Sequence, residues 1–136
     1  MSKNSQYRLI NMETIKPLPT VLILAHHSLL SRGVASTLRE YQSVFNVRLL
    51  DSDLINFPEI IQSESPSIII LDAGDSDVCK KTPVTQLLEW APSAKIIRLD
   101  LSSDRIRIFS SAEFQVSHAA DLVGLIQSFS NAGVIL

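Results

Sequence analysis

Polar side chains that could carry chemistry follow three of the most apolar stretches of the chain. His26 and His27 come directly after a run of branched apolar residues, Asp72 ends a second run, and Asp100 lies near the end of a third. Imidazole and carboxylate groups together suit a transition metal such as zinc. In open parallel sheets, functional groups gather at the carboxyl ends of the strands. We therefore expect these side chains to lie at one end of a sheet.

The elements that must position these residues follow a strand–helix alternation. Short apolar runs, of the kind found in buried parallel strands, predict strands at 21–24, 45–50 and 67–71. Helical spacing begins after the N-cap candidate Ser28 and reaches Tyr41. A second helix is expected after an Asp51 or Asp53 cap, with Pro58 in its first turn. Residues 72–82 are expected to form a loop before a short helix at 83–90.

The last third of the chain breaks this alternation. Residues 95–101 and 104–109 alternate around Ser102 and Ser103, which predicts a β-hairpin that sets Asp100 opposite Arg105 and Leu99 opposite Ile106. Residues 113–117 alternate again, and an amphipathic helix is expected at 119–129. The prediction is an α/β fold with an open, mostly parallel sheet and flanking helices. Between the strand at 95–101 and the last helix there is no room for another full helix, so we expect a β-hairpin within 95–117 instead.

Length and composition fit one globular domain. The 136 residues are 46% hydrophobic, and 12 Lys and Arg against 14 Asp and Glu give a net charge of −2. This balance lacks the basic excess typical of nucleic-acid binding. No run approaches the ~18 apolar residues of a membrane span, and no signal peptide is recognisable. We therefore expect a cytoplasmic protein without nucleic-acid or membrane partners.

Two further features bear on organisation and redox state. Pro17 and Pro19 separate a polar leader from the first strand, so we expect an N-terminal arm at 1–19 and a domain at 20–136. The single Cys79 cannot form an internal disulfide, which suits a reducing compartment. We interpret Cys79 as a bystander whose pKa the following lysines lower slightly.

Two motifs resemble the response-regulator receiver family of two-component signalling. The segment VLILAHHSLLSRGVASTL is similar to that family's opening, and His27, Leu29 and Gly33 reproduce its His-x-Leu-x-x-x-Gly stretch. The segment PSIIILDAGDSD is similar to the family's third strand and sets Asp72 at the phospho-acceptor position. The resemblance covers about residues 20–101. It implies a flavodoxin-like fold and a role in signal transduction rather than an enzyme.

The departures from the family pattern concern its phosphorylation site. The family holds Mg²⁺ with two acidic residues after the first strand, where this chain has Ala25 and His26. The family's Thr or Ser after strand four corresponds to Asp100, and its Lys after strand five corresponds to Ser117. Phosphoryl transfer depends on positioning and charge neutralisation. We therefore expect no Mg²⁺ or other cofactor, and a vestigial acceptor at Asp72.

Three hypotheses about function follow. The leading one is a pseudo-receiver that binds a protein partner of a signalling pathway and forms a homodimer through the hairpin or the last helix. Arg98, Arg105 and Arg107 then line one face of the hairpin, either as a solvated face or toward an acidic partner. The first alternative is a phosphorelay receiver phosphorylated on Asp72. The second is a small-ligand or metal sensor that uses His26 and Asp72.

Overall fold

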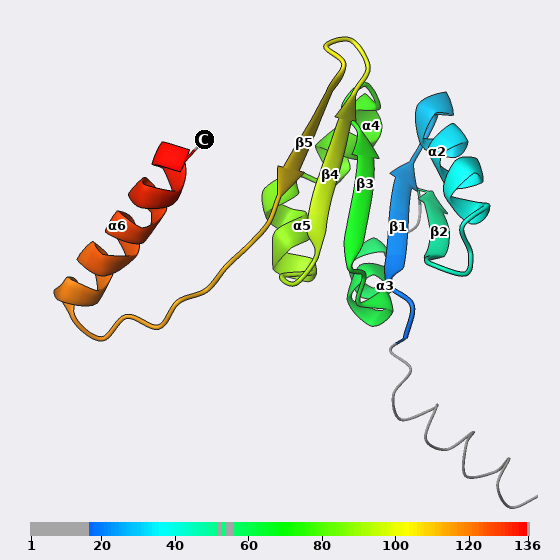
Figure 1. Cartoon of the computed structure of the whole chain (residues 1–136). Coiled ribbons are helices and arrows are strands. Elements are labelled where there is room, and N and C mark those ends of the chain that lie inside the picture. The colour runs from blue at the N-terminus through cyan, green and yellow to red at the C-terminus, as the bar shows by residue number, and fades with distance from the viewer. Residues whose placement is uncertain (1–16, 52, 54–55, 136) are drawn as a thin grey trace, which may run out of the picture.

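The computed structural model describes residues 17–51, 53 and 56–135, so most of the expected N-terminal arm lies outside the described residues. A five-stranded sheet in the order β2-β1-β3-β4-β5 forms its centre (Figure 1). The first four strands are parallel, and the last is antiparallel to its neighbour. The strands are β1 (Thr20–Ala25), β2 (Asn46–Asp51), β3 (Ile68–Asp72), β4 (Lys95–Asp100) and β5 (Arg105–Phe109). The expected α/β fold with an open, mostly parallel sheet and flanking helices is confirmed.

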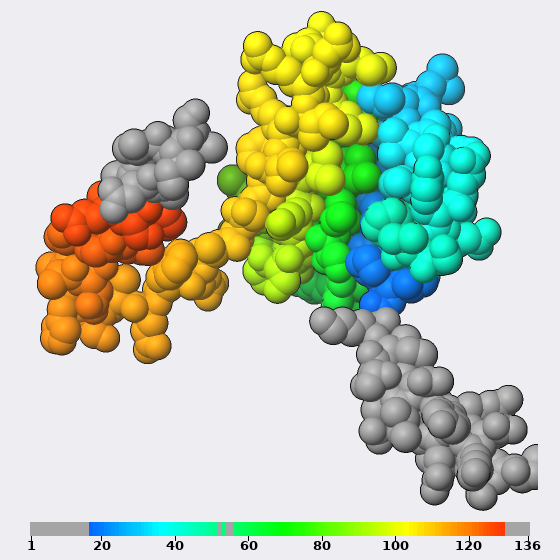
Figure 2. Space-filling model, viewed as in Figure 1, coloured from blue at the N-terminus to red at the C-terminus, as the bar shows by residue number. Residues whose placement is uncertain are grey.

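Helices flank the two faces of the sheet unequally. Helix α2 covers one face, and three helices cover the other, as the two apolar clusters described below show. The fifth helix, α6, stands apart from the sheet at the end of an extended segment (Figures 1 and 2). The helices are α2 (Leu29–Arg39), α3 (Phe57–Glu64), α4 (Ser76–Lys81), α5 (Val84–Trp90) and α6 (Ala119–Ile135).

Ser28 begins α2, as the sequence predicts. Its backbone is extended, and its hydroxyl oxygen accepts a hydrogen bond from the Ser31 N–H at 2.9 Å. This bond satisfies one of the donors that a helix start leaves without a partner. The helix ends at Arg39, and Tyr41, expected to continue it, lies in the following turn and is exposed.

Helix α3 begins later than expected. Its N-cap is Asn56, and Pro58 lies in its first turn as predicted. Neither Asp51 nor Asp53 caps it, because Asp51 is still part of β2 and helical geometry starts only at Phe57. The cap prediction was wrong because two acidic residues precede the helix closely enough in sequence to imitate a cap.

Residues 72–82, expected to be a loop, contain helix α4. Its six residues are too few for a helical period to appear in the sequence. Val78 anchors the helix because its side chain is fully buried. The Thr82 hydroxyl donates to the Val78 carbonyl oxygen at 2.6 Å and ends the helix. Burial of a single residue, rather than periodicity, therefore defines this element.

The two faces of the sheet carry two separate apolar clusters. The larger lies beneath α3, α4 and α5, and its sheet residues are Leu22, Leu24, Leu50, Ile69, Leu71 and Ile96. The smaller lies beneath α2, and its sheet residues are Val21, Val47, Leu49, Ile23, Ile68, Ile70, Ile97 and Leu99. Alternation along each strand sends neighbouring residues to opposite faces, which separates the two clusters.

The predicted hairpin forms, with the predicted register. Asp100 pairs with Arg105 and Leu99 pairs with Ile106 across β4 and β5. Residues 101–104 make the turn, in which Asp104 adopts a left-handed backbone with φ 52°. Residues 113–117, expected to alternate as a strand, belong to no strand and are exposed. With no neighbouring strand to pair with, their alternation has no ladder to stabilise it.

Helix α6 covers the predicted residues 119–129 and continues to Ile135. Its large apolar side chains Leu122, Val123, Ile126 and Phe129 are 49–56% exposed, although an amphipathic helix usually buries its apolar side. Phe114 of the extended segment meets Phe129 edge to face, with ring centroids 6.0 Å apart. The extended segment and the helix therefore contact each other away from the sheet.

Candidate functional site

The carboxyl ends of the parallel strands bring the polar residues together, as expected for an open sheet. Residues His26 and His27 follow β1, Asp51 ends β2, and Asp72 ends β3. A turn after β3 leads into α4, whose start carries two more carboxylates, Asp75 and Asp77. The residues do not form one cluster, however. They divide into a pocket around Asp72 and a group around His26, and the two adjoin because His27 and Asp77 line the pocket.

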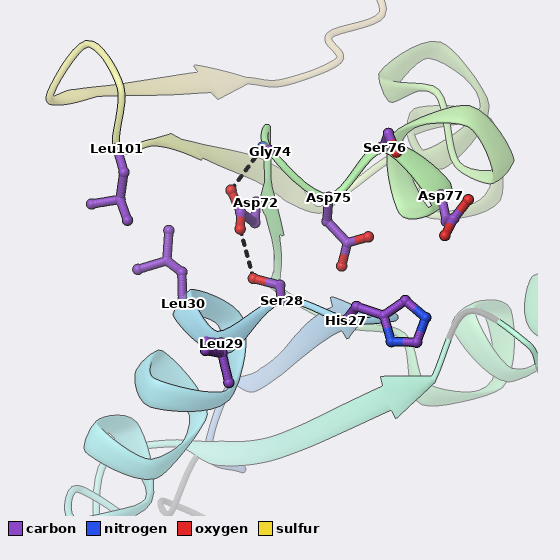
Figure 3. Close-up of a pocket in the computed structure, with 10 residues that line it drawn as sticks. All are labelled: His27, Ser28, Leu29, Leu30, Asp72, Gly74, Asp75, Ser76, Asp77 and Leu101. Atoms are coloured by element: carbon purple, nitrogen blue, oxygen red, sulfur yellow. Dashed lines mark hydrogen bonds between the residues drawn. The ribbon is translucent and has the colours of Figure 1, made fainter.

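Both carboxylate oxygens of Asp72 accept hydrogen bonds. The Ser28 hydroxyl donates to Oδ2 at 2.6 Å, and the Gly74 N–H donates to Oδ1 at 2.8 Å (Figure 3). The same Ser28 oxygen accepts from the Ser31 N–H, so one hydroxyl joins the end of β3 to the start of α2. Asp72 therefore helps to fix the position of α2.

A pocket of about 420 Å³ opens beside Asp72. Figure 3 shows Leu30 of α2 and Leu101 of the hairpin turn on one side of it, and the acidic start of α4 on the other. None of the ion pairs found among the described residues involves Asp72. A phosphoryl group in this pocket would meet three carboxylates, and the residues that line the pocket include no Lys or Arg.

Asp75 ties α4 to the end of β1. Its side chain is buried, and its Oδ2 accepts a hydrogen bond from the His26 backbone N–H at 2.9 Å. A buried carboxylate is stabilised by such a bond. Asp75, expected within a loop, is therefore a structural link between α4 and the end of β1.

His26 faces carboxylates other than Asp72, the partner that the sensor hypothesis names. Its Nδ1 lies 3.3 Å from Asp53 Oδ2 and 3.7 Å from Asp51 Oδ1, and its Nε2 lies 3.5 Å from Asp77 Oδ2. The rings of His26 and His27 lie side by side, with centroids 3.8 Å apart. Adjacent residues of an extended strand point to opposite sides, but β1 ends at Ala25 and the chain bends at both histidines.

The residues beside Asp72 do not fit Mg²⁺, the ion that the receiver resemblance implies. Mg²⁺ takes hard oxygen ligands in octahedral geometry. Ala25 is buried and offers only a methyl group, while His26 offers nitrogen and faces other carboxylates. The oxygens of Asp72 already accept bonds from Ser28 and Gly74. A magnesium site of the family type is therefore not formed by these side chains.

Asp100 and Ser117 lie outside this site. The Asp100 carboxylate accepts hydrogen bonds from the Ser102 hydroxyl at 2.6 Å and the Ser102 N–H at 3.1 Å. These bonds, the hydroxyl bond foremost, lower the pKa of Asp100 below its ordinary value. Ser117 precedes α6, where its N–H donates to Asp121 Oδ2 at 3.2 Å. It ends no strand and lies at the helix that stands apart from the sheet.

The hairpin register sets the three arginines on one face. Arg98 pairs with Arg107, and Arg105 pairs with Asp100, so all three project to the side of the sheet opposite Ile97. The Arg98 guanidinium lies 5.3 Å from the centre of the Phe109 ring, within cation–π range. The interaction role of these arginines stays a prediction.

Cys79 of α4 differs from the expected thiol. Partial burial raises its pKa, and this outweighs the opposing effect of Arg98. The sequence prediction that neighbouring lysines lower the pKa of Cys79 was wrong, because the thiol faces inward. Its Sγ lies 3.4 Å from the Asp72 carbonyl oxygen. A protonated, half-buried thiol is consistent with the expected bystander role.

The sequence reasoning missed the group around His26. Asp51 and Asp53 follow the neighbouring strand, and parallel pairing sets Asp51 beside Ala25. This register could have revealed the group, because His26 directly follows Ala25 and the two aspartates lie at the end of the neighbouring strand. Asp77 could not be placed without α4, which the sequence did not reveal.

Comparison of the chain with protein-family models, with curated proteins and with solved structures found no match. Within the described residues, no helix combines the length and apolarity needed to cross a membrane. Function must therefore be inferred from the residues and contacts of the chain itself.

Proposed function

We propose that this protein is a receiver-like signalling module that acts without phosphorylation, by forming a homodimer. The strand order β2-β1-β3-β4-β5 is the order of flavodoxin-like folds, which supports the receiver resemblance over residues 20–101. The antiparallel β5 stands where that family has a helix and a parallel strand. Asp72 takes part in none of the ion pairs found among the described residues, which supports a role independent of phosphate.

The main support for a homodimer is an apolar face of the hairpin that is exposed to solvent. Ile97 and Leu99 of β4 belong to the cluster beneath α2, and their partners on β5 are Ile108 and Ile106. Opposed residues of an antiparallel pair project to the same face. Ile106 and Ile108 are 65% and 64% exposed. We call these four side chains the open face.

The occupant that we propose for the open face is α6 of a second copy. Leu122, Val123, Ile126 and Phe129 repeat at spacings that set them on one side of a helix. A helix with such a side must bury it to be stable in water. Within the described part of the chain, an apolar sheet face thus has no helix packed on it, and an apolar helix has no sheet beneath it. Their mutual burial removes both from water.

The connection between β5 and α6 favours exchange between two copies. Residues 110–118 are exposed and form no helix or strand, and they lead α6 away from the sheet (Figure 1). These nine residues can span roughly 30 Å, and they exceed the usual ~2–6 residues of a strand–helix loop. If each copy lends its helix to the other, the two contacts are equivalent and the assembly closes as a symmetric dimer.

A groove along α2 extends the apolar docking surface. It has a volume of about 460 Å³ and is lined by Leu29, Leu30, Gly33, Val34, Thr37 and Leu38. Val34 and Leu38 also pack against the same cluster as Ile97 and Leu99. A helix on the open face would therefore meet α2 as well as the sheet. Asp72 has a positioning role in this surface, because Ser28 joins it to the start of α2.

The experiment that tests this proposal compares the two faces of β5. Ile108 projects to the open face, and its neighbour Arg107 projects to the opposite face. The oligomeric state of the full chain is measured by multi-angle light scattering from micromolar to millimolar concentration. We expect a dimer for the wild type and for Arg107→Asp, and a monomer for Ile108→Asp.

Two results would contradict the proposal. One is a wild type that stays monomeric over the whole concentration range, which is also the result expected if α6 folds back on its own chain. The other is dissociation by Arg107→Asp with no effect of Ile108→Asp, which would assign the dimer contact to the arginine face. Circular dichroism of each variant checks that the fold is retained.

A further inference from the structure

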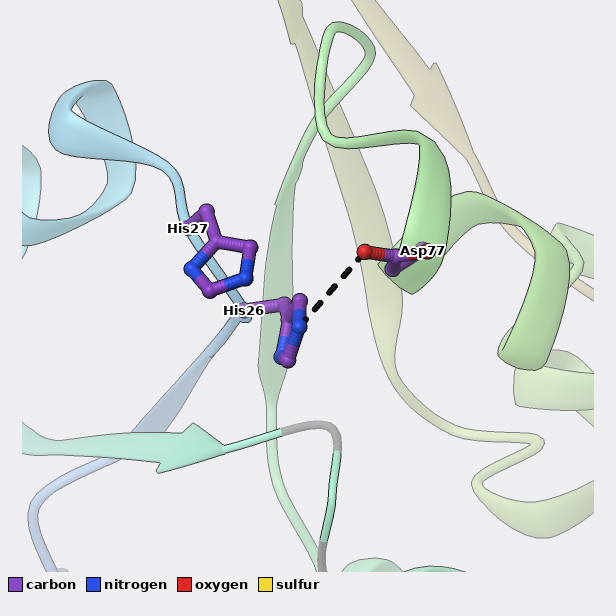
Figure 4. A group of neighbouring side chains, drawn as sticks. All are labelled: His26, His27 and Asp77. Atoms are coloured by element: carbon purple, nitrogen blue, oxygen red, sulfur yellow. Dashed lines mark ion pairs between the residues drawn. The ribbon is translucent and has the colours of Figure 1, made fainter.

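Three side chains with metal-binding atoms meet beside the carboxyl end of β1. His26 and His27 follow the strand, and Asp77 belongs to the first turn of α4 (Figure 4). One ligand atom of each residue lies within 4.8 Å of the others. His26 Nε2 is 3.5 Å from Asp77 Oδ2. We propose that His26, His27 and Asp77 bind a divalent transition-metal ion, with Zn²⁺ as the best-suited ion.

The distance between two of these three atoms matches a tetrahedral zinc site. Bonds of about 2.0–2.2 Å to nitrogen and carboxylate oxygen set two tetrahedral ligand atoms about 3.3–3.6 Å apart. The distance between His26 Nε2 and Asp77 Oδ2 is 3.5 Å. His27 and Asp77 are exposed, so small side-chain rotations can bring the third atom from within 4.8 Å to bonding distance. A water molecule would complete the four ligands, as in zinc sites with three protein ligands.

The second nitrogen of His26 supplies an independent observation. Nδ1 is buried and makes no hydrogen bond within the described chain, yet it lies 3.3 Å from Asp53 Oδ2. A histidine that binds a metal through one nitrogen usually donates its other N–H to a carboxylate, which fixes the ring orientation. Asp53 stands at the position of that carboxylate. Lys81 Nζ holds the other oxygen of Asp53 at 3.0 Å.

The backbone positions His26 before any metal binds. Its N–H donates to the buried Asp75, and its side chain is only 17% exposed. Ring contact with His27 further restricts the imidazole. A ligand whose orientation is already restricted loses less conformational entropy on binding. The site therefore combines one partly buried, restricted ligand with two exposed ones.

The donor set selects the metal. Two imidazole nitrogens and one carboxylate suit zinc and its transition-metal neighbours, whereas Mg²⁺ and Ca²⁺ require mostly oxygen ligands. His27 and Asp77 also line the pocket around Asp72, but the oxygens of that carboxylate accept bonds from Ser28 and Gly74, so Asp72 is not one of the proposed ligands. Binding here would join β1 to α4 and would leave the open face unchanged.

The test uses the full chain without a histidine tag, stripped of metal with a chelator. Isothermal titration with Zn²⁺ should give one ion per chain, and Co²⁺ should give the intense visible absorption of a tetrahedral ion. His27→Ala and Asp77→Asn should each weaken Zn²⁺ binding about tenfold or more. Asp53→Asn should weaken it by about 10–100-fold while retaining the one-to-one stoichiometry.

The matched control is His118→Ala. His118 is the third histidine of the chain, and it lies exposed at the start of α6. We expect its variant to bind Zn²⁺ like the wild type, and Mg²⁺ to give no saturable heat. No Zn²⁺ binding at micromolar concentration, or equal loss in His118→Ala and His27→Ala, would overturn the proposal. Neither outcome depends on whether the chain is a dimer.

Discussion

Ile108 lies directly opposite Ile97 across the β4–β5 hairpin, but the two side chains have different surroundings. Ile97 packs with the cluster beneath α2, whereas Ile108 is 64% exposed. The sheet therefore extends one strand beyond the helix that covers this face. Helix α6 stands apart from the sheet (Figure 2), and its large apolar side chains are exposed as well. The described chain therefore presents two apolar surfaces that could cover each other.

The first prediction concerns protection of α6. In the proposed dimer, α6 is packed against the open face, so its backbone amides should exchange slowly with solvent. Ile126→Asp should abolish this protection over residues 119–129, because it buries a charge in the contact. Gln127→Asp is the matched control, since Gln127 is the next residue and lies outside the apolar set. Hydrogen exchange with mass spectrometry measures both.

Fast exchange of α6 in the wild type at millimolar concentration would contradict this prediction. Equal loss of protection in both variants would also contradict it. Such a result would mean that adding a charge anywhere on α6 is enough to expose its amides, whether or not one side of the helix is packed.

The second prediction concerns the hydroxyl that joins β3 to α2. Ser28 donates to Asp72 and accepts from the Ser31 N–H, so Ser28→Ala removes a helix cap and a bond to a carboxylate. We expect the free energy of unfolding to fall by about 1–3 kcal/mol. Urea denaturation measures the change. Ser36→Ala, at an exposed position of the same helix, should change it by less than about 0.5 kcal/mol.

A double-mutant cycle makes the same test sharper. Asp72→Asn changes the acceptor of the Ser28 hydroxyl, so the effects of the two substitutions should not add. Strict additivity would show that the bond between them contributes nothing to stability.

The third prediction concerns phosphorylation of Asp72. Incubation with a small phosphodonor and Mg²⁺ should leave the intact mass of the protein unchanged, because no cation pairs with Asp72 in the described chain. Mass spectrometry of the wild type and of Asp72→Asn checks this. A phosphoryl adduct on the wild type that is absent from Asp72→Asn would instead support the phospho-acceptor alternative.

Most of the fold could be predicted because burial leaves a clear sequence pattern. The runs that form β1 and β3 are apolar throughout, since helices cover both faces there. The hairpin register followed from alternation around Ser102 and Ser103. Helix α4 escaped prediction because one buried residue, Val78, anchors it and six residues show no period.

The candidate site was harder to predict because it depends on directions that a sequence does not specify. The bend after Ala25 brings both imidazole rings to one side, whereas an extended strand would separate them. The acidic neighbours of His26 come from β2 and α4, so their meeting depends on tertiary packing. The separation of α6 from its own sheet could not be predicted either. An apolar helix side has the same sequence pattern whether it packs against its own chain or against another copy.

The fourth prediction concerns the pH dependence of Asp100. Its pKa is lowered below 3.8, mainly by the Ser102 hydroxyl. A lowered pKa in the folded chain means stability that is present above the unfolded pKa and is lost as the pH falls through the folded pKa. Ser102→Ala removes the hydroxyl bond that contributes most to the lowered pKa, so it should raise the pKa of Asp100 toward its ordinary value. Carboxyl NMR titration measures it, and an unchanged pKa would show that the hydroxyl bond is not its cause.

The most direct test of the proposed dimer is a cross-link between two different variants. Both chains carry Cys79→Ser, one with Ile108→Cys on the open face and the other with Ile126→Cys on α6, and a size tag distinguishes them. After mixing, a short thiol cross-linker is added, and the products are separated by mass. We predict that the mixed pair is the main cross-linked species, because α6 of each chain lies on the open face of the other. Failure to form the mixed pair at concentrations where the wild type is associated would contradict the proposed exchange of α6.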